Sequence, residues 1–183
     1  VLLVSLTLVG RSLRNVLDVE PGFDARGVLT APLLVQQPGS ERAAFLSALH
    51  RALEARLGPR TVSVVNQLPL TNDGSRRFMR RRPSEPPREV VLREAATGYF
   101  DVMRIGLVAG RGFDARDDVS APPRVVVSRS LAEQWFPGEQ PIGQQIQLGP
   151  GPDAPRAEII GVAGDVKHRS LGAVAFWPTV CAS

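Results

Sequence analysis

Apolar residues recur along the chain with two different periods, one typical of helices and the other of strands. The clearest helix covers residues 41–57, because an apolar residue recurs at every fourth position from Phe45 to Leu57. Ser40 precedes this run as an N-cap, and a Gly-Pro pair directly follows it. These signals predict one long helix with one apolar side.

The segments on either side of that helix predict strands. Residues 28–36 form an apolar run in which Pro32 favours a sheet edge or a bulge. Residues 61–68 alternate apolar and polar side chains. A strand, a helix and a second strand in this order predict a βαβ-like unit.

Downstream of this unit, short apolar blocks separated by Gly- and Pro-rich turns predict four more strands and two short helices. Turn chemistry at both ends of residues 72–87 predicts a mobile loop or a short exposed hairpin. We expect the strands at 89–95, 125–128, 144–148 and 157–162, and the helices at 98–105, capped by Thr97, and from Ser130, as N-cap, to Phe136. The succession predicts an α/β or α+β fold with a mixed sheet.

The first residues are almost entirely apolar. Val1 to Val9 are nine apolar or small residues, whereas a bilayer span needs about 20. They fit the last part of a membrane helix, and a helical pattern continues to Leu17 before Pro21 and Gly22 break it. An ordinary amphipathic helix explains the composition equally well.

Composition narrows the class of protein without identifying it. The chain has 183 residues, enough for one domain or two small ones, and a net charge of +4. Lys167 is its only lysine, which indicates a coding bias toward arginine more simply than a functional demand for guanidinium groups. The excess charge is too small to mark a general polyanion binder. The lone Cys181 forms neither an internal disulfide nor a zinc site.

The sequence lacks the usual signatures of catalysis. There is no Gly-x-Ser-x-Gly elbow of the α/β-hydrolase type. His50 lies at the edge of an apolar helix face and His168 just past a strand, positions that favour packing or surface roles. Cys181 has no cysteine-protease signature near it. We therefore expect no catalytic residue and no enzyme.

Ligand-binding signatures fail on spacing. Asp114, Asp117 and Asp118 do not follow the alternation of an EF-hand loop, so a solvated turn or a helix N-terminus explains them better than a metal. The run from Ala109 to Gly112 begins like a dinucleotide fingerprint but lacks its third glycine and a following long helix. We expect neither a metal nor a cofactor.

Nucleic-acid binding is the next alternative, because β-α-β-β-α-β is also the element order of an RNA-recognition module. Such modules stack bases on aromatic residues in central strands. The predicted strands at 61–68 and 89–95 contain no aromatic residue. We therefore expect no nucleic-acid partner.

One five-residue sequence occurs twice. GFDAR spans Gly22 to Arg26 and again Gly112 to Arg116. The repeat is compatible with duplication of a βα unit, and equally with a turn that arose twice.

The ordered set of segments, more than any one motif, resembles the MacB-like periplasmic core domain of ABC transporter permeases of the MacB/FtsX type. It covers nearly the whole chain. The segments that carry the likeness are LLVSLTLVGRSLRNV, VEPGFDARGVLTA, SERAAFLSALHRALEARLG, VNQLPLTNDG, TGYFDVMRIGLVAGRGFDARD, RVVVSRSLAEQWFPGEQPIGQQIQLG and AEIIGVAGDVKHRSL.

This resemblance implies a non-catalytic module with a βαβ-containing, porter-like mixed sheet and a second small subdomain. Residues 1–17 would be the C-terminal end of a transmembrane helix, and residues 18–183 an extracytoplasmic core domain on the periplasmic side of a bacterial inner membrane. The implied partners are the membrane, a cytoplasmic ABC ATPase subunit or domain, a second permease copy and an envelope protein. No catalytic, metal-binding or cofactor-binding residue is implied.

Two points qualify the resemblance. The residues after Leu171 depart from the family pattern, so the domain is expected to be truncated at the C-terminus or altered there. Arg11 and Arg14 would lie on the outer side, against the positive-inside tendency. The alternative is a soluble binding domain that recognises an anionic ligand through the basic segment comprising Arg76, Arg77, Arg80, Arg81 and Arg82.

The physical role expected of the permease module is mechanical. The short connector from Asp18 to Asp24 would join the membrane helix to the folded domain. A short connection between two packed elements couples their displacements.

Overall fold

The computed structural model describes residues 11, 21–36, 39–71, 75–117, 121–151, 153–167 and 179–182. The predicted membrane helix at residues 1–17 therefore lies, apart from Arg11, outside the described residues. Within the described ranges, no helix has both the length and the apolar character that a bilayer crossing needs.

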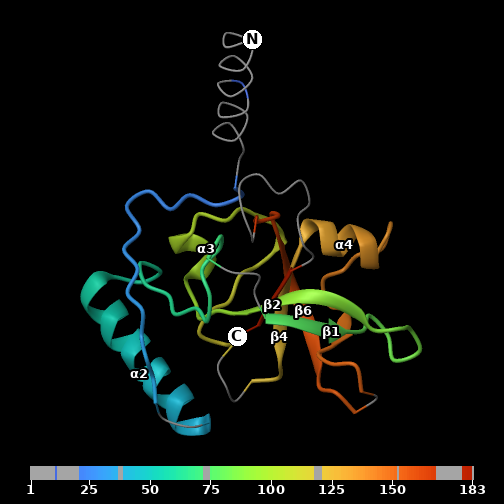
Figure 1. The fold of residues 1–183 in the computed structure, drawn as a ribbon, viewed down its shortest axis with the longest axis horizontal. Coiled ribbons are helices and arrows are strands. Elements are labelled where there is room, and N and C mark those ends of the chain that lie inside the picture. Colours follow the sequence, from blue (N-terminus) through green and yellow to red (C-terminus); the bar gives the residue numbers. More distant parts are fainter. Residues whose placement is uncertain are drawn as a thin grey trace, which may run out of the picture.

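The described strands form one seven-stranded mixed sheet (Figure 1). They are β1 (Ser75–Met79), β2 (Arg88–Glu94), β3 (Leu107–Gly110), β4 (Arg124–Ser128), β5 (Gln145–Gln147), β6 (Arg156–Ala163) and β7 (Thr179–Ala182). The order is β1-β2-β7-β4-β6-β3, with β5 also paired to β6. The pairs β2–β7 and β4–β6 are parallel, and the others are antiparallel.

The mixed α/β fold expected from the sequence is confirmed, and its βαβ unit lies in the second half of the chain. Helix α4 (Arg129–Trp135) follows β4, and the chain returns through β5 to β6, which runs parallel to β4. This arrangement places α4 beside the sheet (Figure 1).

Both faces of the sheet are buried, which explains the unbroken apolar runs of its central strands. On β4, Val125 and Val127 point to a cluster that contains Leu131 and Trp135 of α4. Val126 points to the opposite face. There the aromatic side chains of residues 99, 100 and 113 form a second cluster with Met103 and Ile105. The strands predicted at 89–95, 125–128, 144–148 and 157–162 are confirmed within one residue at each end.

The long predicted helix is confirmed, but its flanking strands are not. Helix α2 spans Gly39–Leu57, so it begins before Ser40. Residues 28–36 are irregular, and Leu29 is 98% exposed, because no described strand pairs with them. Residues 61–68 make only one bridge, from Val65 to Ala95. The predicted βαβ unit at 28–68 is therefore wrong.

Two predicted helix starts also need correction. Helix α3 covers only Tyr99–Val102 and begins after Gly98, whose left-handed φ of 80° forms the turn, so Thr97 does not cap it. The cap of α4 is Ser128, whose hydroxyl accepts a hydrogen bond from the Leu131 amide. Ser130 lies one residue inside the helix.

Three strands were not predicted as such. Strand β1 pairs antiparallel with β2, so the hairpin is not contained in residues 72–87, which supply one strand and the turn while the predicted strand at 89–95 supplies the other. Strand β3 ends within the run that begins like a dinucleotide fingerprint, because it contains Ala109 and Gly110 but not Arg111 and Gly112. Strand β7 lies at the centre of the sheet, between β2 and β4, although the residues after Leu171 were expected to be atypical.

Candidate functional site

The connector that precedes the domain is fastened to it by backbone contacts. The amide of Lys167 donates to the carbonyl of Pro21 at 2.9 Å, and the amide of Asp24 donates to the carbonyl of Met103 at 2.9 Å. Gly22 has a φ of 83°, and a Cβ built there would lie 1.9 Å from the carbonyl oxygen of Asp165. Only glycine permits this approach, so the connector docks beside the segment that follows β6.

The docked connector carries a charged turn. The carboxylate of Asp24 accepts from the amide of Arg26 at 2.9 Å and from its Nε and Nη2 at 3.0 and 2.9 Å. Arg104, which follows α3, forms an ion pair with the same carboxylate at 3.1 Å and donates a hydrogen bond to the Arg26 carbonyl at 3.0 Å. The hydrogen bonds from the Arg26 side chain are the main cause that holds the pKa of Asp24 well below its usual range.

The second copy of GFDAR forms the same turn. Asp114 accepts from the amide, Nε and Nη2 of Arg116 at 2.9, 3.0 and 2.7 Å. Phe23 and Phe113, one residue before each aspartate, both pack on the cluster beneath α3. The sequence repeat is therefore a repeat of local geometry, in which the aspartate bonds the backbone and the side chain two residues on. Duplication of a larger unit stays a hypothesis.

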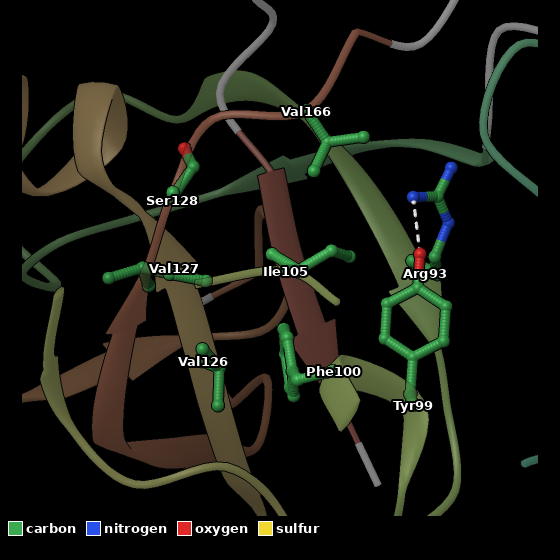
Figure 2. Close-up of a pocket in the computed structure, with 10 residues that line it drawn as sticks. Arg93, Tyr99, Phe100, Ile105, Val126, Val127, Ser128 and Val166 are labelled. Atoms are coloured by element: carbon green, nitrogen blue, oxygen red, sulfur yellow. Dashed lines mark hydrogen bonds between the residues drawn. The ribbon is translucent and has the colours of Figure 1, made fainter. Parts of the chain in front are cut away.

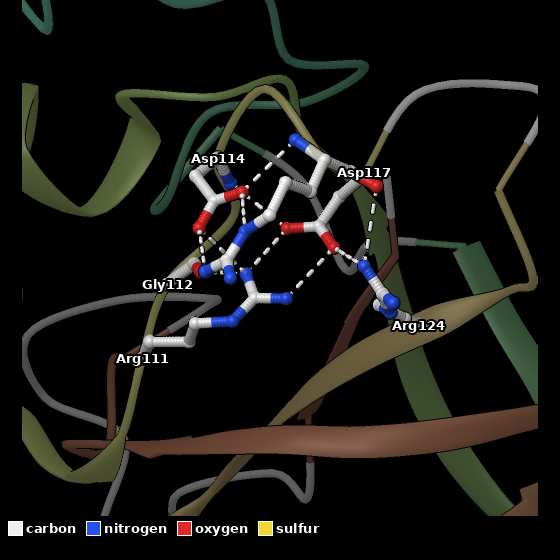
Figure 3. A network of polar contacts seen from close by, with 6 residues as sticks. Arg111, Gly112, Asp114, Asp117 and Arg124 are labelled. Carbon is white, nitrogen blue, oxygen red and sulfur yellow. Dashed lines mark hydrogen bonds and ion pairs between the residues drawn. The ribbon is translucent and has the colours of Figure 1, made fainter.

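The second turn also holds a buried carboxylate (Figure 3). The side chain of Asp117 has no exposed surface and accepts from Arg111 at 2.6 and 3.0 Å. It also accepts from the Asp114 amide at 2.9 Å and from Arg124, at the start of β4. Arg111 follows β3, so this carboxylate ties two strand ends together. Asp114 and Asp117, two of the three aspartates expected in a solvated turn or at a helix N-terminus, instead belong to an ionic cluster.

This cluster makes stability depend on pH. Burial by itself raises the pKa of Asp117, but the hydrogen bonds from Arg111, the Asp114 amide and Arg124 outweigh it and lower the pKa to about 2. A lowered folded-state pKa means that the carboxylate stabilises the fold above its ordinary pKa of 3.8, and that this contribution is lost as the pH falls through about 2.

We expect this group to contribute about 2 kcal/mol to the free energy of unfolding at pH 7, a contribution lost between about pH 5 and pH 1. Urea unfolding over that range measures it. The Asp117→Asn variant keeps the shape without the charge and should show a correspondingly flatter acid dependence. An identical slope in the variant would contradict this assignment.

The other sequence candidates do not assemble into a site. The buried His50 ring lies 3.1 Å from the carbonyl of Val62, which is the packing role expected. His168 and Asp118 lie outside the described residues, as does the side chain of Cys181. Among the described residues, no group of three His, Cys, Asp or Glu side chains is placed to hold a metal.

The basic segment is divided by the structure. Arg76 and Arg77 lie on β1, paired with β2, and do not belong to a loop. Arg80 donates to the carbonyls of Pro83 and Glu85. The five arginines therefore do not form one loop, because two of them lie on β1 and Arg80 is bonded within the turn that follows β1.

A small cavity lies under α3 (Figure 2). Buried Arg93 donates to the hydroxyl of Tyr99 at 3.1 Å beside it, and Phe100, Ile105 and Val126 line the rest. Its volume is about 20 Å³, room for roughly one water molecule. It is too small for a substrate.

The residues that the connector contacts could not be predicted from the sequence. The sequence identified the short connector and the repeated GFDAR, and an aspartate two residues before an arginine, found twice, is a signal for this turn. The partners Met103, Arg104 and Lys167 lie about 80 to 145 residues away along the chain, so no local pattern could assign them.

Comparison with known proteins identifies the family. The family model described as "MacB-like periplasmic core domain" matches residues 2–179. The periplasmic region of MacB from Actinobacillus actinomycetemcomitans is 18% identical with a TM-score of 0.51, over 74% of this chain and 53% of that one. No curated protein matches.

Two further solved structures are similar at lower scores. The extracellular domain of the noncanonic ABC-type transporter YknZ from Gram-positive bacteria is 20% identical, with a TM-score of 0.48, over 75% of this chain and 62% of that one. A domain of a putative permease from Porphyromonas gingivalis is 17% identical, with a TM-score of 0.49, over 73% and 55%. The match thus spans less than two thirds of each of these domains. Given the family model and the shared fold, the chain belongs to the family of MacB-like periplasmic core domains, which are extracytoplasmic domains of ABC transporter permeases.

Proposed function

We propose that this domain is a non-catalytic mechanical relay, which couples ATPase-driven motion of a permease to transport or to work on an envelope partner. Residues 1–17 are the end of the transmembrane helix that delivers the motion. The permease sits in the bacterial inner membrane with this domain on the outer side, works with a cytoplasmic ABC ATPase and acts as a dimer. Family membership supports this context.

The docked connector is the observation that carries the proposal. Pro21, Gly22 and Asp24 each contact the folded domain through fixed backbone groups, and Asp24 is also paired with Arg104. Little flexible chain therefore separates these residues from a helix that leaves the membrane just before them, so that a displacement of the helix is passed to the domain. Packed interiors transmit such displacement because they have few voids.

Replacing Pro21 and Gly22 in the intact permease by a Gly/Ser linker of about 12 residues is expected to abolish transport while the domain stays folded. Such a linker relaxes over a distance of about 20 Å, which exceeds the shifts of a few Å typical of coupled helices. The measurements are substrate flux or drug export in cells, and ATP hydrolysis by the purified complex. ATP hydrolysis should persist without transport.

The matched control carries the same linker between Leu29 and Thr30. That point is exposed and lies after every connector contact, so the membrane helix stays attached to the domain. This variant should keep transport. Normal transport with the linker at residues 21–22 would refute the relay.

A further inference from the structure

Among the described residues, the edge of β5 that faces away from β6 is paired at one position only. The hydrogen bonds from the Ile159 amide to Gln144 and from the Leu148 amide to Pro155 show that even-numbered residues of this strand face β6. Odd-numbered residues therefore turn their backbone groups outward. The Gln147 amide donates to the Arg80 carbonyl at 2.8 Å, and the Gln147 carbonyl accepts from the Arg80 amide at 3.1 Å.

That bridge is isolated, so the ladder does not continue to the next outward-facing residue, Gln145. The hairpin chain instead bends away at Arg81 and Arg82, where Glu85 closes a turn on the Arg82 carbonyl at 3.0 Å. The divergence leaves a groove of about 330 Å³, which Gln145 and Arg82 line from opposite sides. An extended backbone placed there would continue the interrupted ladder.

The rim of this groove is cationic. Arg156, which begins β6, lines it, is exposed and has no ion-pair partner among the described residues. Arg82 is half-exposed, and the ion pair it forms among the described residues is with the exposed carboxylate of Glu139, at 3.5 Å. Guanidinium groups present planar donor pairs that match carboxylates.

The third arginine of the groove is fixed in place. Arg81 donates to the Trp135 carbonyl at 2.6 Å and to Glu85, and it lies 5.9 Å from the centre of the Phe136 ring. It therefore forms a rigid wall that ties the hairpin to the end of α4. The groove is built on held elements, so a ligand need not order it.

We propose that this groove binds an extended acidic peptide segment of a partner protein, which adds to the free edge at Gln145 and places its carboxylates on Arg82 and Arg156. An edge strand supplies main-chain hydrogen bonds for such a segment, and alternate side chains reach the rim. A small free anion would use the guanidinium groups alone and leave the strand edge unused. This inference does not depend on the relay function.

The test is a titration of the 183-residue chain, kept in mild detergent, into a fluorescently labelled Glu-Val-Glu-Val-Glu peptide with blocked ends. We expect saturable binding that weakens as salt is raised. Arg156→Glu should weaken binding about tenfold, because it turns one attraction into a repulsion. Arg51→Glu, an exposed charge reversal on α2, should leave it unchanged. Thermal unfolding confirms that both variants fold.

Two further peptides distinguish addition of a strand to the β5 edge from binding by charge attraction alone. A Lys-Val-Lys-Val-Lys peptide should not bind. Methylation of the backbone nitrogen of the central glutamate should weaken binding of the acidic peptide at least fivefold. Equal binding of the methylated peptide, or full competition by inorganic phosphate at equal concentration, would assign the groove to a small anion and overturn the proposal. Unchanged binding by Arg156→Glu would overturn it as well.

Discussion

Substitution of Asp117 by alanine is expected to lower the free energy of unfolding by about 3 kcal/mol. The side chain of Asp117 is fully buried and accepts hydrogen bonds from Arg111, Arg124 and the Asp114 amide. Its removal leaves two partly buried guanidinium groups without their shared carboxylate, and the ends of β3 and β4 lose their common tie. The measurement is urea unfolding at pH 7, followed by circular dichroism.

Asp114→Ala is the matched control in the same turn. The Asp114 side chain is 40% exposed, and water screens its pairing with Arg116 and Arg111, so this variant should lose clearly less stability. If Asp114→Ala proved as damaging as Asp117→Ala, the cluster would owe its contribution to the turn itself and not to the buried charge.

Substitution of Gly161 by alanine is expected to cost about 3 kcal/mol. A Cβ at Gly161 would lie 2.2 Å from the carbonyl oxygen of Arg111. That carbonyl cannot easily retreat, because the Arg111 amide is bonded to the Ile160 carbonyl at 3.0 Å and its side chain is held by Asp117. Thermal and urea unfolding measure the loss.

Gly164→Ala tests whether this cost is specific to position 161. A Cβ at Gly164 would lie 3.5 Å from the Gly106 carbonyl, an ordinary contact. This variant should be as stable as the original chain or slightly more so, since alanine restricts the unfolded state. Equal stability of the two variants would show that the turn carrying Arg111 yields, contrary to the geometry.

The sequence predicted two kinds of element, the strands that are buried on both faces and the long helix, whose period is regular. The apolar runs of β4 and β6 were found because strands covered on both faces read as continuous Val and Ile. Helix α2 was predicted because an apolar residue recurs at every fourth position and a Gly-Pro pair follows the run. In the two strands the local pattern and the tertiary environment agree, whereas on α2 the apolar side chains of Phe45 and Leu57 stay exposed.

The elements that failed depend on partners elsewhere. Residues 28–36 have the composition of a strand, yet no described strand pairs with them, and Pro32 removes one donor. Residues 61–68 reach only one bridge with Ala95. Strand β7 was missed for the opposite reason, because its four residues become a central strand only through pairing with β2 and β4.

The candidate site divides in the same way. The local sequence indicates the connector and both Asp-x-Arg turns, but the residues they contact, such as Arg104 for Asp24, depend on the fold. The sequence marked Arg81 and Arg82, which line the groove beside β5, as part of a basic segment, but it did not predict the groove. The groove arises because the hairpin leaves the ladder after Arg80.

The position of β7 has a consequence for biosynthesis. Among the described strands, β7 is the one that joins β2 to β4, the hairpin's other link to the sheet being the single Arg80–Gln147 bridge, and every other described strand precedes β7 in the chain. As the polypeptide emerges, the two parts must wait with β2 and β4 presenting unpaired backbone edges, which are templates for aggregation. A nascent chain stalled before Thr179 should therefore need a chaperone or rapid proteolysis, whereas emergence of β7 lets the sheet close in one step.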